Sequence, residues 1–468
     1  MKINPPKAII DENDPFKHAL FGRKDFAESL TGLLRNVSEG LVIFVNAPWG
    51  EGKTTFSQMW RAHLQQQKLD VIYFDAYAAD YFDDPFVSFS GDILGLVDKR
   101  LSEGKGLIER REFKETAVEV GKRLAGLAVK VGLRAASLGA IESAHLAEMK
   151  EIGSEIATGV SEIGADVIEK RIENYVGEKD ALKKFRESLA KLAAKVREEQ
   201  GFPLTIIVDE LDRCRPDFAL GLLERIKHLF DVDGVAFVLL VNRRQIENYI
   251  QTVYGNLDAS AYLLKFGNLF IDLPNQQSAF SFHYEKGRQD YCQILVAHYG
   301  FCERVSDGGF LARSLWTLVD HFDLTLREIE KAFTIMTLYY SSLLQGEHTN
   351  EFLIAMLSVL KLKRPSIYQR LSTRSISASR FFKETGLDQL KEGNGQNVSQ
   401  EWVKDILNYY LMSDAELEKA RKNDDGTEKD IRSGPGRMGS WLSSCRMNRD
   451  RVIPFFCGRL DRFSLQPK

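Results

Sequence analysis

The chain has 468 residues, of which 44% are apolar and 28% are charged, and its formal net charge at pH 7 is −3. This length exceeds what one compact core fills, so two or three substructures are expected, and the small net charge gives no overall attraction to nucleic acid or membranes. Five scattered cysteines contain no Cys-x-x-Cys pair, which indicates neither a disulfide framework nor a structural zinc site.

The N-terminal sequence MKINPPKAIIDENDP lacks the apolar core of a secretion signal. Nowhere does the chain approach the run of about 20 apolar residues that a spanning helix requires. A reducing, cytoplasmic location without a transmembrane span is therefore expected.

Five short runs rich in Val, Ile and Phe are apolar throughout rather than alternating, which is typical of strands buried on both faces of a parallel sheet. They are residues 41–46, 71–76, 205–210, 235–242 and 269–274. Helix-length segments lie between them, at 54–68, 216–230 and 244–254. This β-α-β rhythm predicts an α/β fold with a central, mostly parallel five-stranded sheet.

The first predicted strand runs directly into the sequence NAPWGEGKTT, residues 46–55. Gly52, Lys53 and Thr54 fit the end of a phosphate-binding loop, and Ala47 replaces a Gly that mainly turns the chain. Backbone N–H groups of Trp49 to Thr54 would cradle phosphates, Lys53 would reach the β- and γ-phosphates, and Thr54 would bind Mg²⁺. The predicted nucleotide-binding residues are Trp49, Gly50, Glu51, Gly52, Lys53, Thr54 and Thr55.

About 130 residues separate the second and third predicted strands, far more than a crossover needs, and this insertion is helical in character. An amphipathic segment with an acidic face, 149–167, follows a basic one, and we interpret the two as an antiparallel helical hairpin turning near Ser137–Ser143. The charges within 117–141 disfavour a membrane-spanning hairpin. Peripheral membrane contact through the basic face and a soluble arm used for assembly remain alternatives.

The third predicted strand ends in the acidic pair of TIIVDELDRC. Asp209 would hold Mg²⁺, directly or through water, and Glu210 would orient and deprotonate the attacking water. The predicted catalytic residues are therefore Lys53, Asp209 and Glu210, and the predicted metal ligands are Thr54 and Asp209. A Gly-containing turn and an unrelated acidic pair would be the alternative, but both motifs end predicted strands and the first opens a helix.

With HLFDVDGVAFVLLVNRRQI and YLLKFGNLFIDLP, these motifs resemble the KAP family of P-loop NTPases over residues 15–340. The resemblance implies a sheet of the additional-strand catalytic-glutamate type, a long helical insertion between the two motifs, and a helical C-terminal region. Members include plasmid-borne phage-exclusion proteins of bacteria. It therefore implies an ATP-driven switch or assembly module in anti-phage defence, acting as a homo-oligomer or with a partner effector protein.

The resemblance also suggests four residues that respond to the nucleotide. Asn242 ends the fourth strand, where related ATPases place a sensing residue between the motif strands. Arg213 would sense the γ-phosphate or bind Glu210 in the idle state, with a plain salt bridge as the alternative. Lys265 stands where related ATPases carry an arginine finger reaching a neighbouring subunit, and Arg327 resembles a lid-helix arginine that contacts phosphate. A structural lysine and an ordinary surface arginine are their alternatives.

No Asn-Lys-x-Asp motif occurs, which favours ATP over GTP. The predicted domains are 1–104 and 201–275 for the NTPase core, 105–200 for the insertion, 276–420 for a helical lid or C-terminal domain, and 421–468 for a linker and tail. From Trp441 onward the tail interleaves basic and aromatic residues, a composition that suits a surface binding nucleic acid. A folded helical cap is the alternative interpretation of the tail. A non-hydrolysing nucleotide-binding scaffold remains the alternative for the whole chain.

Overall fold

The computed structural model describes residues 2–6, 10–11, 13–36, 38–69, 71–81, 85–100, 108–121, 163–274, 287–301, 308–343, 350–390, 398–420 and 448–462. The chain forms two compact units. The sheet unit comprises Ile10–Pro48 and Lys53–Pro274, and the helical unit comprises Met1–Ile9, Trp49–Gly52 and Asn275–Lys468. The predicted turn of the helical hairpin, near Ser137–Ser143, lies outside the described residues.

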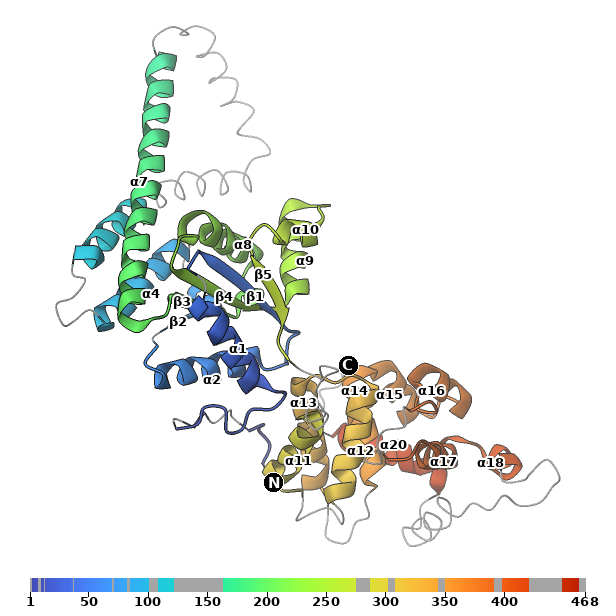
Figure 1. Cartoon of the computed structure of the whole chain (residues 1–468). Helices are drawn as coiled ribbons and strands as arrows, with labels where there is room; N and C mark the ends of the chain where they lie inside the picture. The colour runs from blue at the N-terminus through green and yellow to red at the C-terminus, as the bar shows by residue number, and fades with distance from the viewer. Residues whose placement is uncertain are drawn as a thin grey trace. The chain divides into compact units, whose positions relative to one another are not determined.

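Five parallel strands form the centre of the sheet unit, in the order β2-β3-β4-β1-β5 (Figure 1). They are β1 (Leu41–Asn46), β2 (Ile72–Asp75), β3 (Leu204–Asp209), β4 (Val235–Val241) and β5 (Leu269–Asp272). The five predicted strands are confirmed, and every pairing is parallel. Because β4 pairs with both β1 and β3, the strand that precedes Asn242 separates the two motif strands.

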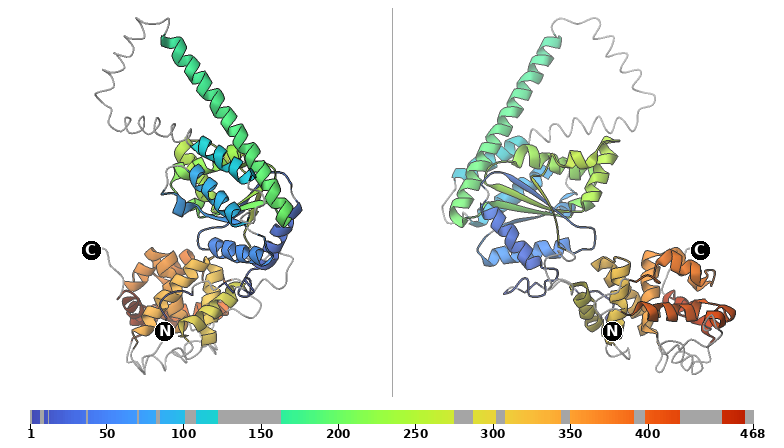
Figure 2. Two further views of the ribbon diagram at one scale, coloured as in Figure 1. Left: turned by 90° about the vertical axis from the view of Figure 1, so that its left-hand side faces the viewer. Right: turned by 45° about the vertical axis from the view of Figure 1, so that its right-hand side comes forward.

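Helices cover both faces of this sheet (Figure 2). One face carries α1 (Arg23–Asn36) and α2 (Lys53–Gln66), which pack around the fully buried Trp60. The opposite face carries α4 (Pro85–Arg100), a helix at 108–121, α7 (Ile163–Gln200), α8 (Pro216–Arg225), α9 (Arg243–Tyr254) and α10 (Ala259–Leu263). Both sides of the central strands are thus buried, which explains why their sequences are apolar throughout.

The described ends of the helical insertion are anchored on the sheet unit. α7 has 38 residues, which corresponds to a length of about 57 Å at 1.5 Å per residue. Its second half contributes Phe185 to the core, and the Phe185 ring lies 5.4 Å from that of Phe113 in the helix at 108–121. In the described ranges, the structure contains no helix that is both long and apolar enough to cross a membrane.

The helical unit confirms the predicted helical character of the region after Pro274. Its longer helices are α11 (Gly287–Tyr299), α12 (Gly308–His321), α13 (Leu326–Ser341), α14 (Glu351–Lys363), α15 (Pro365–Ser372), α16 (Ala378–Thr385), α17 (Gln400–Leu411), α18 (Asp414–Ala420) and α20 (Val452–Leu460). α14 is the central helix, since every residue from Phe352 to Leu360 is buried. α13 begins with a capping box, in which Thr325 and Glu328 satisfy each other's backbone N–H groups.

Candidate functional site

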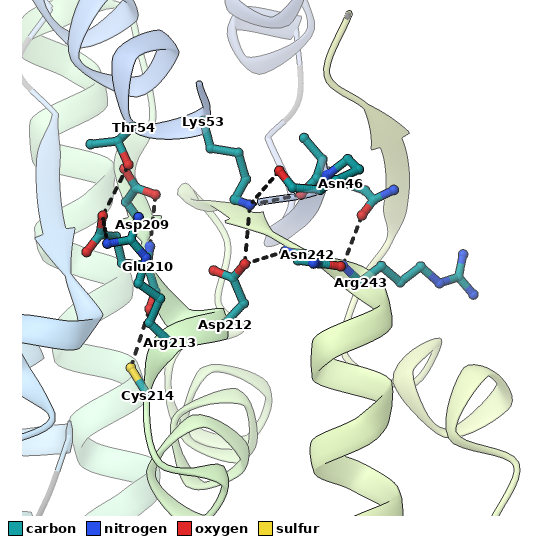
Figure 3. Close-up of polar contacts among 12 residues, drawn as sticks. Asn46, Lys53, Thr54, Asp209, Glu210, Asp212, Arg213, Cys214, Asn242 and Arg243 are labelled. Carbon is teal, nitrogen blue, oxygen red and sulfur yellow. Dashed lines mark hydrogen bonds and ion pairs between the residues drawn. The ribbon is translucent and has the colours of Figure 1, made fainter. Parts of the chain in front are cut away.

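Polar side chains gather at the carboxyl ends of β1, β3 and β4 (Figure 3). Parallel strands all end at the same edge of the sheet, where α/β proteins bind their ligands. α2 begins at Lys53 at this edge, so its first N–H groups lack intrahelical partners and are suited to an anion.

Lys53 is the charged group of the phosphate-binding motif, and it is almost fully buried. Its Nζ donates to the carbonyl oxygen of Ala47 at 2.8 Å and lies 3.2 Å from Oδ2 of Asp212. Burial lowers the pKa of Lys53, and the Asp212 carboxylate opposes that shift. The ammonium is therefore held beside the loop by a buried partner that the sequence did not reveal.

The two predicted motifs meet at Thr54. Its hydroxyl donates to Oε1 of Glu210 at 3.3 Å, although the two residues are 156 positions apart. Asp209, at the end of β3, is fully buried, and burial raises the pKa of its carboxyl while hydrogen bonds from neighbouring groups oppose the shift. A buried carboxylate that accepts several hydrogen bonds is stabilised in its charged form.

Glu210 has a strained backbone in the left-handed region, with φ 61° and ψ 18°. Such strain costs on the order of 1–3 kcal/mol for a non-glycine residue and is typical of functional sites. Oε1 of Glu210 lies 2.9 Å from Nη1 of Arg213, one turn later in the 3₁₀ helix Leu211–Arg213. Burial raises the pKa of Glu210, and the Arg213 guanidinium opposes this. Of the roles suggested for Arg213, binding to Glu210 matches this geometry, and sensing of the γ-phosphate stays a prediction.

Polar contacts join the ends of β1, β3 and β4 (Figure 3), and one further hydrogen bond reaches β5. Oδ2 of Asp212, which holds Lys53, also accepts the backbone N–H of Asn242 at 3.0 Å. Asn46 accepts the N–H of Arg243 at 2.9 Å and donates to Asp272 at 2.7 Å. Asn242 is thus connected to the phosphate-loop lysine through Asp212, whereas its sensing role stays a prediction.

The tip of the loop, Trp49–Gly52, belongs to the helical unit. Gly50 has φ +91°, and its carbonyl accepts the N–H of Arg327 at 3.2 Å. A Cβ built on Gly50 would lie 2.8 Å from that of Arg327, so this close approach requires glycine. Oε1 of Glu51 lies 3.5 Å from the buried guanidinium of Arg288 on α11. The main chain of Arg327 therefore contacts the loop at Gly50. Contact between the Arg327 guanidinium and phosphate stays a prediction.

Lys265 is exposed after α10, and its Nζ lies 4.8 Å from the centre of the Tyr262 ring. This local contact fits the structural role considered for Lys265, and its action in a neighbouring subunit stays a prediction.

In the tail, Phe456 is buried, Arg449 pairs with Asp414, and Arg459 lies over the Phe455 ring. The tail residues Trp441, Arg446, Phe463 and Lys468 lie outside the described residues. The described part of the tail is thus helical and partly buried, and nucleic-acid binding by the tail stays a prediction.

Sequence reasoning missed the groups that support the site. Asp212 lies within the run TIIVDELDRC but received no role from the sequence, and neither did Ser57 and Tyr73, which hydrogen-bond to Asp209. The spacing of Ser57, one helical turn after Lys53, was a usable signal because it places both on one side of α2. Tyr73 was detectable as the side chain with a hydroxyl group in the run VIYFDA.

The residues at this edge fit a magnesium–nucleotide complex by their chemistry. Mg²⁺ binds oxygen ligands and is usually held by one or two carboxylates together with phosphate oxygens and water. The Thr54 hydroxyl, which hydrogen-bonds Glu210, and the Asp209 carboxylate lie together next to Lys53 in Figure 3, so two hard oxygen donors are available at this edge. Any bound Mg²⁺ would supply charge neutralisation for the phosphate oxygens.

A parallel sheet with a Gly-Lys-Thr loop before α2 and an acidic pair after β3 defines a P-loop NTPase. The family profile described as "KAP family P-loop domain" matches residues 23–343, more than half of the chain. The chain belongs to this family. Comparison with curated proteins gave no match.

Among solved structures, the Aeropyrum Pernix ORC2 protein (ADPNP-ADP complexes) is similar at 14% sequence identity. The comparison covers 97% of each chain and has a TM-score of 0.34. At this level the likeness carries no argument about function.

Proposed function

We propose that this chain is a Mg²⁺-dependent ATPase that works as a nucleotide-driven switch or assembly module. The observation that carries the proposal is the contact between Thr54 and Glu210, because it joins the two motifs at one edge of the sheet. The strand order, with β4 between β1 and β3, supports the additional-strand catalytic-glutamate type of P-loop NTPase. ATP is favoured over GTP by the lack of a guanine-reading sequence.

In the proposed reaction, Lys53 neutralises phosphate charge and the N–H groups at the loop and at the start of α2 hold the phosphate oxygens. Glu210 orients a water molecule and accepts its proton. Arg213 lowers the pKa of Glu210 and so makes it a weaker base. Glu210 must therefore loosen its pairing with Arg213 to act, which gives the site an idle and an active arrangement.

The setting in which this switch works is proposed from the resemblance to phage-exclusion members of the family. We propose anti-phage defence, with a separate partner effector protein performing the step that harms the phage. The alternative is a scaffold that binds ATP without hydrolysing it. Glu210 argues against this alternative, because it is held next to Thr54 in a strained backbone conformation that is typical of functional sites.

The test compares Mg²⁺-dependent ATP hydrolysis by the wild type and by Glu210→Gln. The substitution keeps the shape of the side chain and removes the base, so hydrolysis should fall by about 10²–10⁴-fold. Binding of a non-hydrolysable ATP analogue should stay within about 3-fold, a difference worth less than 1 kcal/mol. Glu112→Gln, which removes a carboxylate from a surface pair with Lys191, is the matched control. Equal hydrolysis by the wild type and Glu210→Gln would refute the ATPase assignment.

A further inference from the structure

The carboxylate of Asp209 is held by two hydroxyl groups that lie outside both motifs. Ser57 Oγ donates to Oδ2 of Asp209 at 3.0 Å, and the Tyr73 hydroxyl donates to the same oxygen at 3.1 Å. The other oxygen, Oδ1, accepts the backbone N–H of Glu210 at 2.8 Å. A carboxylate oxygen has about two acceptor positions, so Ser57 and Tyr73 fill those of Oδ2.

These donors come from two different elements that neighbour β3. Ser57 lies on α2, one turn after Lys53, and Tyr73 lies on β2, which pairs with β3 in parallel register. The Tyr73 ring is itself placed by the Arg61 guanidinium, 5.6 Å from the ring centre. Rotation of the Asp209 carboxylate would therefore break hydrogen bonds to α2 and β2 together.

We propose that Tyr73 is a positioning residue for the metal-binding carboxylate of the ATPase site. Tyr73 and Ser57 hold Oδ2, which leaves Oδ1 as the oxygen of Asp209 with remaining capacity for a cation or for its bound water. The inference rests on the proposed function, and it adds a residue on β2 that neither motif contains. Groups that orient a ligating carboxylate typically change metal affinity by 10–100-fold when they are removed.

The alternative is that the Tyr73 hydroxyl merely satisfies a buried carboxylate and contributes only to folding. The two roles differ in what they change. A positioning hydroxyl affects binding of the metal and leaves metal-free nucleotide binding intact, because Lys53 is held by Ala47 and Asp212, whereas the Tyr73 hydroxyl binds Asp209. A purely structural hydroxyl affects stability and both binding reactions alike.

The experiment measures Mn²⁺ binding by electron paramagnetic resonance, with the full-length chain saturated by a non-hydrolysable ATP analogue. In parallel, calorimetry gives the affinity for the same analogue in EDTA. Tyr73→Phe should weaken Mn²⁺ binding about 10-fold and leave the affinity in EDTA within about 2-fold of the wild type. Ser57→Ala should act in the same direction, and it provides a second variant that does not alter β2.

The matched control is Tyr254→Phe. It removes a hydroxyl that donates to Glu224 at 2.8 Å in the same unit, between α9 and α8. Mn²⁺ affinity should not change in this variant. Unchanged Mn²⁺ affinity in both Tyr73→Phe and Ser57→Ala, or an equal loss with and without metal, would overturn the inference.

The outcome also separates this inference from the proposed function. A wild-type chain that binds metal and analogue but does not hydrolyse ATP would refute the ATPase assignment, while a selective loss in Tyr73→Phe would still support positioning. A wild-type chain without metal-linked binding would overturn both proposals. Normal hydrolysis with unaltered metal binding in the two variants would overturn the positioning role alone.

Discussion

Removing Asp212 should destabilise the sheet unit more than removing Asp212 and Lys53 together. The Lys53–Asp212 pair is separated by 3.2 Å, and the two side chains are only 9% and 1% exposed. Asp212→Leu leaves the ammonium buried without this partner, which costs about 3–5 kcal/mol. It also takes the acceptor from the N–H of Asn242, which costs a further ~1–3 kcal/mol. The double variant Lys53→Met with Asp212→Leu contains neither charge, so only the cost of the unpaired N–H of Asn242 remains.

The double-mutant cycle should therefore give a coupling free energy of at least about 3 kcal/mol between the two positions, because Lys53→Met also leaves a buried charge unpaired. The pH dependence gives an independent check. Burial already lowers the pKa of Lys53, and loss of Asp212 lowers it further. The unfolded chain then binds more protons than the folded chain, so the stability of Asp212→Leu rises with pH. The stability deficit of Asp212→Leu relative to the double variant should therefore shrink as the pH rises towards the ordinary lysine pKa of 10.5.

Hydrogen exchange of β4 measures the free energy of opening of this unit without assuming that the whole chain unfolds in one step. The control is Glu247→Leu, which breaks a partly exposed pair with Arg243 and should cost less than about 1 kcal/mol. Additive effects of the two single substitutions, with a coupling near zero, would refute the idea that the pair is held as a buried unit.

Two further predictions concern other parts of the fold. Burial by itself raises the pKa of Glu328, but hydrogen bonds from Lys363 and Thr325 outweigh it and hold the pKa below its ordinary value of 4.5. Its contribution to stability, about 1 kcal/mol for a helix cap, is present above pH 4.5 and is lost as the pH falls through the folded pKa. In calorimetry, the deficit of Glu328→Gln should be largest near pH 7 and shrink below pH 4.5. Separately, Gly267→Ala should lower the stability of the sheet unit by about 1–3 kcal/mol, because its Cβ would lie 2.5 Å from the Phe44 ring.

The controls for these two predictions lie in comparable environments. Glu351→Gln, in the first turn of α14, is the control for Glu328→Gln. If the loss of stability in Glu328→Gln is the same at every pH, the Glu328 carboxylate does not contribute through its charged form, and the prediction is wrong. Gly221→Ala is the control for Gly267→Ala, because a Cβ there meets nothing within 4 Å and helix propensity should make it neutral or stabilising. Equal stability of both alanine variants would contradict the predicted clash.

The strands and the two motifs were predictable because their signals are local. β4 reads as seven apolar residues in a row, and each residue is buried in the sheet. The acidic pair was predictable for the same reason, since it directly follows a buried strand. The order of the strands needed the resemblance as well, because periodicity does not report which strands are neighbours.

The supporting contacts were not predictable, since they join residues that are distant in sequence. Tyr73 and Asp209 are 136 positions apart, and a hydroxyl in an apolar run does not reveal its acceptor. The domain boundaries show the same limit. The NTPase core was predicted in two parts, 1–104 and 201–275, and this division stays a prediction, whereas the structure groups Met1–Ile9 and Trp49–Gly52 with the helical unit.

The discontinuity has a practical consequence for dissecting the protein. A chain ending at Pro274 would keep Trp49–Gly52 and lose α11 and α13, and with them the arginine side chain facing Glu51 and the amide that meets the Gly50 carbonyl. Such a fragment would contain every residue of both sequence motifs but would lack these two contacts to Gly50 and Glu51. Nucleotide affinity measured on the fragment would reflect the loss of these contacts, so enzymatic assays should use the chain with both units present.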